Sequence, residues 1–155
     1  MDTERMSISD RLKDIRLYYG YKQTEIANKL GICRNAYCEY EHYKRVIPIK
    51  RLNTLANFYN LNIDYLIGLS NIRSEINATD IDINIVSSRI SQVRTDNKLN
   101  VSEFAKILNI STALVSYYES GKRLISTSVC YDISKKFNIS VDYLLGKSNE
   151  KYVKK

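Results

Sequence analysis

The chain has 155 residues and a mass of 18.0 kDa, which leaves room for one ordinary domain or two very small ones. Hydrophobic residues make up 44% of it, enough for a packed core, whereas five glycines and one proline are too few for a turn-rich all-β fold. Lys and Arg outnumber Asp and Glu by 24 to 17, and the net charge of +7 favours a polyanionic partner, nucleic acid before membrane.

We expect a cytoplasmic protein without a membrane segment. Residues 1–5 include acidic side chains and precede no apolar run, which is unlike a signal peptide, and no stretch approaches 18 apolar residues. The three cysteines, Cys33, Cys38 and Cys130, are odd in number and lack the spacing of a disulfide framework. Reduced thiols are therefore expected.

The sequence repeats itself at a constant spacing of 78 residues. Asp64–Gly68 recurs as Asp142–Gly146, and Tyr40-Glu41 recurs as Tyr118-Glu119. So many matches at one spacing, with no gap, indicate a tandem duplication of a small domain. Further matching pairs are Arg11 and Arg89, Arg16 and Arg94, Ala27 and Ala105, Leu30 and Leu108, and Lys44-Arg45 and Lys122-Arg123.

We therefore expect two domains, residues 7–71 and 83–149. Between them lies a polar linker, residues 72–82, without Gly or Pro. A short basic tail, residues 150–155, follows the second domain and is expected to be frayed, as chain ends usually are.

Each copy is predicted to form five short helices, so the expected fold class is all-α. Gly31 in the first copy and Asn109 in the second end the second helix, because both residue types tolerate the left-handed conformation. A third helix starts after a two-residue gap, with Ser111 as a good N-cap and Cys33 as a poor one. A helix, a tight turn and another helix make a helix-turn-helix. The apolar residues of the first helix in copy one are Ile8, Leu12, Ile15 and Tyr19.

The order of Gln23–Ala27, Gly31-Ile32, Tyr40-Glu41, Lys44-Arg45 and Asn62–Gly68 resembles the lambda-repressor/Cro (XRE) family of DNA-binding domains. The second copy resembles it again, and more closely around the third helix. The resemblance implies two tandem five-helix lambda-repressor-like domains that bind duplex DNA sequence-specifically, usually as a dimer. The family consists mainly of bacterial and phage transcriptional regulators, so a repressor encoded by a bacterium or phage is the expected function.

The outward face of the third helix is the predicted base-reading surface, because the second helix of the motif enters the major groove. Arg can bind guanine, Asn can pair with adenine, and Glu can accept a hydrogen bond from cytosine. The second copy offers a less polar, uncharged surface, so the two domains are expected to read different half-sites, or the second mainly to position the protein. The predicted base-contacting residues are Arg34, Asn35, Cys38 and Glu39, and Thr112, Ala113, Ser116 and Tyr117.

Phosphate contacts are expected from groups around this helix. Gln23 holds the family's phosphate-contacting position, where the second copy has Val101. Tyr43 and Tyr117 are the tyrosines placed for DNA, and Tyr43 stands where the second copy has Gly121, so a distorted turn is expected there. The other predicted phosphate-contacting residues are His42, Lys44, Arg45, Ser120, Lys122 and Arg123.

Two Arg–Glu pairs have a structural role in the family. Arg16 and Glu41 are 25 residues apart, as are Arg94 and Glu119, and each pair is expected to bridge the first and third helices of its copy. Because breaking a buried pair costs about 3–5 kcal/mol, losing one partner should unfold the domain.

Enzymatic chemistry is a poor fit to this sequence. It has one histidine, His42, and lacks a nucleophile elbow, a Gly-rich phosphate loop or a His/Cys cluster, so we expect no catalytic site, metal, cofactor or small-molecule effector. An alternative function remains open at this stage. One copy could have become a dimerisation or protein-interaction module, which the uncharged reading helix of the second copy and Val101 favour.

Overall fold

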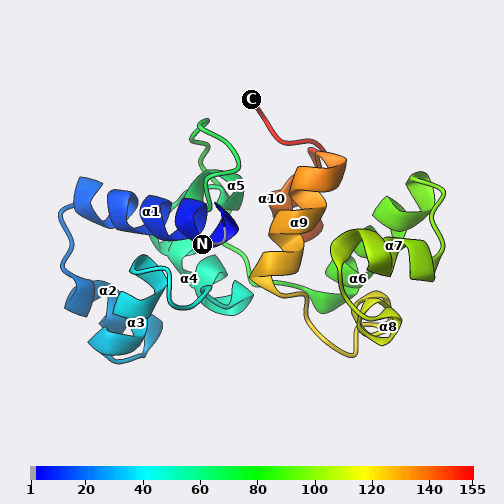
Figure 1. Ribbon diagram of the computed structural model, residues 1–155. Coiled ribbons are helices and arrows are strands. Elements are labelled where there is room, and N and C mark those ends of the chain that lie inside the picture. Colours follow the sequence, from blue (N-terminus) through cyan, green and yellow to red (C-terminus); the bar gives the residue numbers. More distant parts are fainter. Residues whose placement is uncertain (1–2) are drawn as a thin grey trace. The chain divides into compact units, whose positions relative to one another are not determined.

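The computed structural model describes residues 3–155. The expectation that the chain does not start with a signal peptide rests partly on residues 1 and 2, which lie outside the described residues. This described part holds ten α-helices and, apart from one isolated β-bridge, no β-structure, which confirms the all-α prediction (Figure 1). None of the helices within residues 3–155 is long and apolar enough to cross a lipid bilayer. The chain divides into two compact units, Met1–Ala78 with Lys154–Lys155, and Thr79–Val153.

Each unit contains five helices in the same order, as the duplication predicts. In the first unit they are α1 (Thr3–Tyr18), α2 (Gln23–Leu30), α3 (Arg34–Glu41), α4 (Ile49–Tyr59) and α5 (Ile63–Leu66). In the second they are α6 (Ile83–Asp96), α7 (Val101–Leu108), α8 (Thr112–Ser120), α9 (Thr127–Phe137) and α10 (Val141–Leu144).

The core of the first unit forms where apolar faces of the helices meet. Ile8, Leu12 and Ile15 of α1 are buried as their spacing predicts, and α3 contributes Tyr37 and Tyr40, both fully buried. Tyr19 is the exception, because α1 ends at Tyr18 and the Tyr19 side chain stays 40% exposed. Its ring stacks on Tyr59 of α4, with the two ring centroids 5.2 Å apart.

The turn between α2 and α3 has the conformation that the sequence predicts. Gly31 ends α2 with a φ of 67°, and Asn109 ends α7 with a φ of 53°. The next residue in each copy donates its N–H back to the helix, from Ile32 to Ala27 at 3.0 Å in the first unit. The Ser111 hydroxyl accepts from the Leu114 N–H, whereas Cys33 makes no side-chain cap.

The expected distortion after α3 is wrong. Tyr43 takes up the left-handed conformation itself, with a φ of 61°, close to the 76° of Gly121. The N–H groups of Lys44 and Arg45 both donate to Glu39 O, as the corresponding pair in the second unit donates to Tyr117 O. A left-handed tyrosine is strained. Its phenol donates to the Asp10 carboxylate, which is a contact that glycine could not make.

The expected fraying of the C-terminal tail is also wrong. The Ser140 N–H donates to Lys151 O at 2.9 Å, and Ile139 and Tyr152 form an antiparallel bridge. Ser140 precedes α10, where backbone N–H groups need partners outside the helix. The tail supplies one of these partners, the Lys151 carbonyl, and is therefore held against the residues that precede α10.

The same pairing holds the start of the segment after α5 onto the first unit. The Asn62 N–H donates to Ser74 O at 3.0 Å, and the Ser74 N–H donates to the Asn62 side-chain oxygen at 2.9 Å. The Ile76 N–H donates to the side-chain oxygen of Asn60. Asn62 corresponds to Ser140 in the repeat, so in both copies the backbone N–H at this position binds the segment that follows the fifth helix.

Candidate nucleic-acid interface

A buried ion pair fixes α3 against α1 in the first unit. The Arg16 Nε donates to Glu41 Oε1 at 2.6 Å, and Arg16 Nη2 donates to Glu41 Oε2 at 3.0 Å. Burial alone would raise the pKa of Glu41, but hydrogen bonds from Arg16 and Gln23 outweigh it and hold that pKa below its usual value. The hydrogen bond with Glu41 likewise raises the pKa of Arg16, so both groups stay charged. The bidentate geometry orients α3 relative to α1.

The matching pair in the second unit is more open. The Arg94 Nε donates to Glu119 Oε1 at 2.6 Å, but the two side chains are 17% and 14% exposed, against 9% and 0% for Arg16 and Glu41. Val101 occupies the position of Gln23 and cannot donate to the carboxylate. Helix α8 is therefore held by fewer polar contacts than α3.

The outward face of α3 carries the four predicted base-contacting residues. Arg34 and Asn35, in the first turn, are exposed, and Cys38 and Glu39 are half-buried. The Glu39 carboxylate lies 3.2 Å from Arg45 Nε, in a largely exposed pair. The structure thus brings together one residue predicted to contact a base and one predicted to contact phosphate. A surface pair of this kind is weak, so DNA could separate it at little cost.

A shallow depression of about 390 Å³ opens beside the N-terminus of α2. It is lined by Arg16, Lys22, Gln23, Thr24 and Arg34. One amide hydrogen of Gln23 is held by Glu41 Oε2 at 2.9 Å, so a phosphate would use the second. The N–H groups at a helix start attract anions. Lys22 and Thr24 were missed by the sequence reasoning, although a lysine directly before a predicted helix start was a usable signal.

The loop after α3 presents the remaining predicted phosphate contacts of the first unit. His42, Lys44 and Arg45 are all exposed. The His42 Nδ1 lies 2.8 Å from Cys38 O and 3.2 Å from Cys38 Sγ, so its ring is turned back onto the end of α3. In this loop Arg45 is paired with Glu39, whereas the Lys44 ammonium has no ion pair among the described residues.

The equivalent surface of α8 is uncharged but lies among cations. Tyr117 is 40% exposed, and its ring centroid lies 5.9 Å from Lys122 Nζ and 5.6 Å from the Arg123 guanidinium carbon. The Ser120 hydroxyl donates to Tyr117 O, within its own helix. Positive charge therefore flanks α8 too. The other predicted base-contacting residues, Thr112, Ala113 and Ser116, are all exposed.

Comparison with known proteins identifies both copies. A family model described as a helix-turn-helix domain matches residues 10–72, and a second, described as helix-turn-helix, matches residues 90–144. No solved structure matches the chain with significance.

Curated relatives are named as transcriptional regulators. The chain is 35% identical to the HTH-type transcriptional regulator ImmR of Bacillus subtilis over 94 residues, which cover 61% of this chain and 73% of that protein. It is 25% identical to the cryptic phage CTXphi transcriptional repressor RstR of Vibrio cholerae over 107 residues, covering 69% and 86% of the two chains. The similarity to an uncharacterized SPbeta prophage-derived regulator, YonR of B. subtilis, is 38% over 58 residues, covering 37% and 54%.

Proposed function

This chain belongs to the lambda-repressor/Cro-type (XRE) helix-turn-helix family, and from that premise we propose that it is a transcriptional repressor that reads duplex DNA through the major groove. In each unit the second helix of the motif, α3 or α8, enters the groove. Because its partner is DNA of a bacterium or phage, the protein works in the cytoplasm. The relatives named as a regulator and a phage repressor support this function.

The observation that carries the proposal is the exposed pair Arg34 and Asn35 at the start of a helix whose orientation is fixed by buried charge. A flexible polar face could not discriminate bases, because hydrogen bonds to base edges need fixed geometry. The Arg16–Glu41 bridge supplies this rigidity with a 2.6 Å contact beneath the reading face. Phosphate contacts from Lys44 and from the depression at Lys22 would then set the register on the duplex.

The experiment is selection of bound duplexes from a random pool with the full chain, followed by affinity measurements at several salt concentrations. Arg34→Ala should relax the preference at one base position. A matched control is Lys29→Ala, which removes an equal charge from the same unit. The Lys29 ammonium lies 4.8 Å from the Phe58 ring centroid, and Lys29 is not among the residues predicted to contact DNA. Failure of the wild-type chain to enrich any sequence, or equal effects of both variants, would refute major-groove reading by α3.

A second function for α8 is favoured by its uncharged surface. If the second unit is a dimerisation module, Tyr117→Asp should shift the sedimentation coefficient of the full chain towards the monomer and leave the preferred bases unchanged. If α8 reads DNA, the same variant should alter selected bases and leave the sedimentation unchanged. The positive charges of Lys122 and Arg123 beside Tyr117 favour the second outcome.

A further inference from the structure

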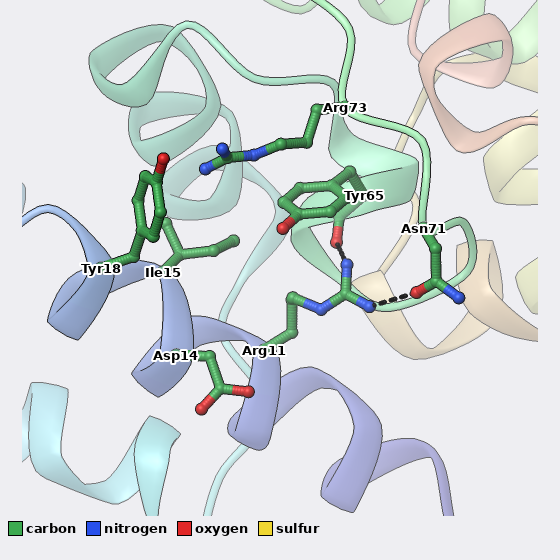
Figure 2. A pocket seen from close by; sticks show the side chains of 7 residues that line it. All are labelled: Arg11, Asp14, Ile15, Tyr18, Tyr65, Asn71 and Arg73. Atoms are coloured by element: carbon green, nitrogen blue, oxygen red, sulfur yellow. Dashed lines mark hydrogen bonds between the residues drawn. The ribbon is translucent and has the colours of Figure 1, made fainter.

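A cavity of about 310 Å³ lies in the first unit between α1 and the segment that follows α5. Figure 2 shows its lining: side chains of α1, Tyr65 of α5, and Asn71 and Arg73 from the segment beyond. In Figure 1, α3 lies below α1 and this segment above it, so the cavity is away from the reading helix.

Two guanidinium groups and two aromatic rings give the cavity its chemistry. The Arg11 guanidinium carbon lies 4.4 Å from the Tyr65 ring centroid, and Arg11 donates to Tyr65 O at 2.7 Å and to Asn71 Oδ1 at 2.9 Å. Arg73 extends between two rings, 4.4 Å from the centroid of Tyr18 and 5.4 Å from that of Tyr65. In the described part of the chain, neither arginine has an ion pair with a carboxylate.

The second copy is an internal control for these contacts. Arg89 repeats the contacts of Arg11, stacking on Tyr143 at 4.2 Å and donating to Asn149 Oδ1 at 3.1 Å, so this arginine belongs to the shared scaffold. The position of Arg73 is taken by Lys151 and that of Tyr18 by Asp96, and these two form an ion pair at 2.8 Å. The second copy thus neutralises the cation that the first copy leaves between the exposed ring of Tyr18 and the half-buried ring of Tyr65.

Exposure of the Tyr18 ring is not required by the fold. Tyr18 is 69% exposed and the preceding Leu17 is 56% exposed, whereas the second copy has Thr95 and Asp96 at these places. An exposed aromatic ring beside an unneutralised guanidinium is suited to bind a flat molecule with negative charge, since the ring supplies a stacking surface and the guanidinium a forked donor.

We propose that this cavity binds a small aromatic anion, in which a carboxylate or phosphate is joined to a planar ring. The anionic group pairs with Arg73 and with the remaining donors of Arg11, and the ring packs against the phenol rings of Tyr18 and Tyr65. The cavity volume is at the lower end of the range for small-molecule sites. Asp14 also lines the cavity, but its carboxylate is directed away from Arg73 in Figure 2.

The test is a calorimetric titration of the full chain, without DNA, with benzoate and with adenosine 5′-monophosphate. Benzamide and adenosine serve as neutral counterparts, and inorganic phosphate as an anion without a ring. We expect at least one aromatic anion to bind with a Kd below about 1 mM and at least tenfold more tightly than its neutral counterpart and phosphate. Binding of benzoate alone assigns a carboxylate ligand, and binding of the nucleotide alone a phosphate ligand.

Variants locate the binding. Arg73→Ala and the milder Arg73→Gln should each weaken binding at least tenfold, while Lys151→Ala, at the matching position of the second copy, should leave it unchanged. Thermal melting of the unliganded variants checks that they fold. The proposal is overturned if no aromatic anion binds up to about 10 mM, if the neutral counterparts or phosphate bind equally well, or if Lys151→Ala has the same effect as Arg73→Ala. None of these outcomes bears on DNA reading, because no DNA is present.

Discussion

Replacing Arg16 with Ala should cost the first unit far more stability than the equivalent replacement of Arg94 costs the second. The Glu41 side chain is fully buried, so Arg16→Ala strands a carboxylate that water cannot reach, at a cost of about 3–5 kcal/mol. Glu119 is 14% exposed and can recover water, so losing its charged hydrogen bond should cost about 1.5–3 kcal/mol.

Amide hydrogen exchange on the full chain can measure both costs, because it reports each unit separately. Each 1.4 kcal/mol corresponds to about a tenfold change in an equilibrium constant. The amide protection factors in α4 should therefore fall roughly 100-fold to 4,000-fold in Arg16→Ala, while those in α9 are unchanged. In Arg94→Ala, protection in α9 should fall by roughly 10-fold to 100-fold.

A control separates a stranded charge from the loss of a favourable bond. Replacing both partners with apolar residues of similar volume, Arg16→Met with Glu41→Leu, removes the buried charge altogether and should recover most of the lost protection. Wild-type protection in Arg16→Ala, or equal losses in both units, would refute the link between burial and cost.

Three further outcomes follow from the interface and its turn. Arg34→Ala should cost about 1–3 kcal/mol of DNA affinity at one base position. Lys44→Ala should weaken binding to all sequences alike and reduce the slope of log binding constant against log salt concentration by about one. Titration of selected duplexes measures both effects. Because the pKa of Glu41 is depressed, its contribution to the free energy of unfolding is fully present above the unfolded pKa of about 4.3 and is lost as pH falls through the folded pKa. The free energy of unfolding of the first unit should therefore fall less steeply with decreasing pH in Glu41→Gln than in the wild type. Asn109→Gly should be neutral or stabilising by up to about 1 kcal/mol in thermal melting, and Asn109→Ala destabilising by a similar amount, since φ there is 53°.

The fold was predictable because its signals are local or repeated. Left-handed residues ended α2 and α7, Ser111 capped α8, and the 78-residue spacing showed that one domain occurs twice. Tyr19 was misplaced because helical spacing continues past the end of α1, whereas Tyr19 already belongs to the turn, which continues at Gly20 with a φ of 75°. Periodicity identifies a face but not the residue at which a helix stops.

The errors at Tyr43 and in the tail have a common cause. Each depends on a contact beyond the local turn: the Tyr43 phenol donates to Asp10, 33 residues earlier, and the Lys151 carbonyl accepts from Ser140, 11 residues earlier. A backbone carbonyl is present in every residue, so a pairing strand such as this tail has no residue signature. Local propensity alone then predicts a distorted turn and a frayed end.

The interface was only partly predictable for a similar reason. Outward positions on α3 follow from helical geometry once Tyr37 and Tyr40 are assigned to the core, and both are buried. The pairing of Glu39 with Arg45 depends on side-chain conformations that spacing does not determine. The depression at Lys22 likewise exists only because α2 and α3 meet there.

A duplicated fold separates the residues that build the domain from those that give each copy its own chemistry. Arg11 and Arg89, which lie 78 residues apart, make the same contacts, and Arg16 and Arg94 each donate through Nε to a glutamate in the third helix of their unit at 2.6 Å. Differences gather instead on two exposed surfaces, the outward faces of α3 and α8 and the cavity at Arg73. Since the scaffold tolerates either residue set at these places, folding does not account for the differences. Distinct base preferences and a ligand held by one copy alone would account for them.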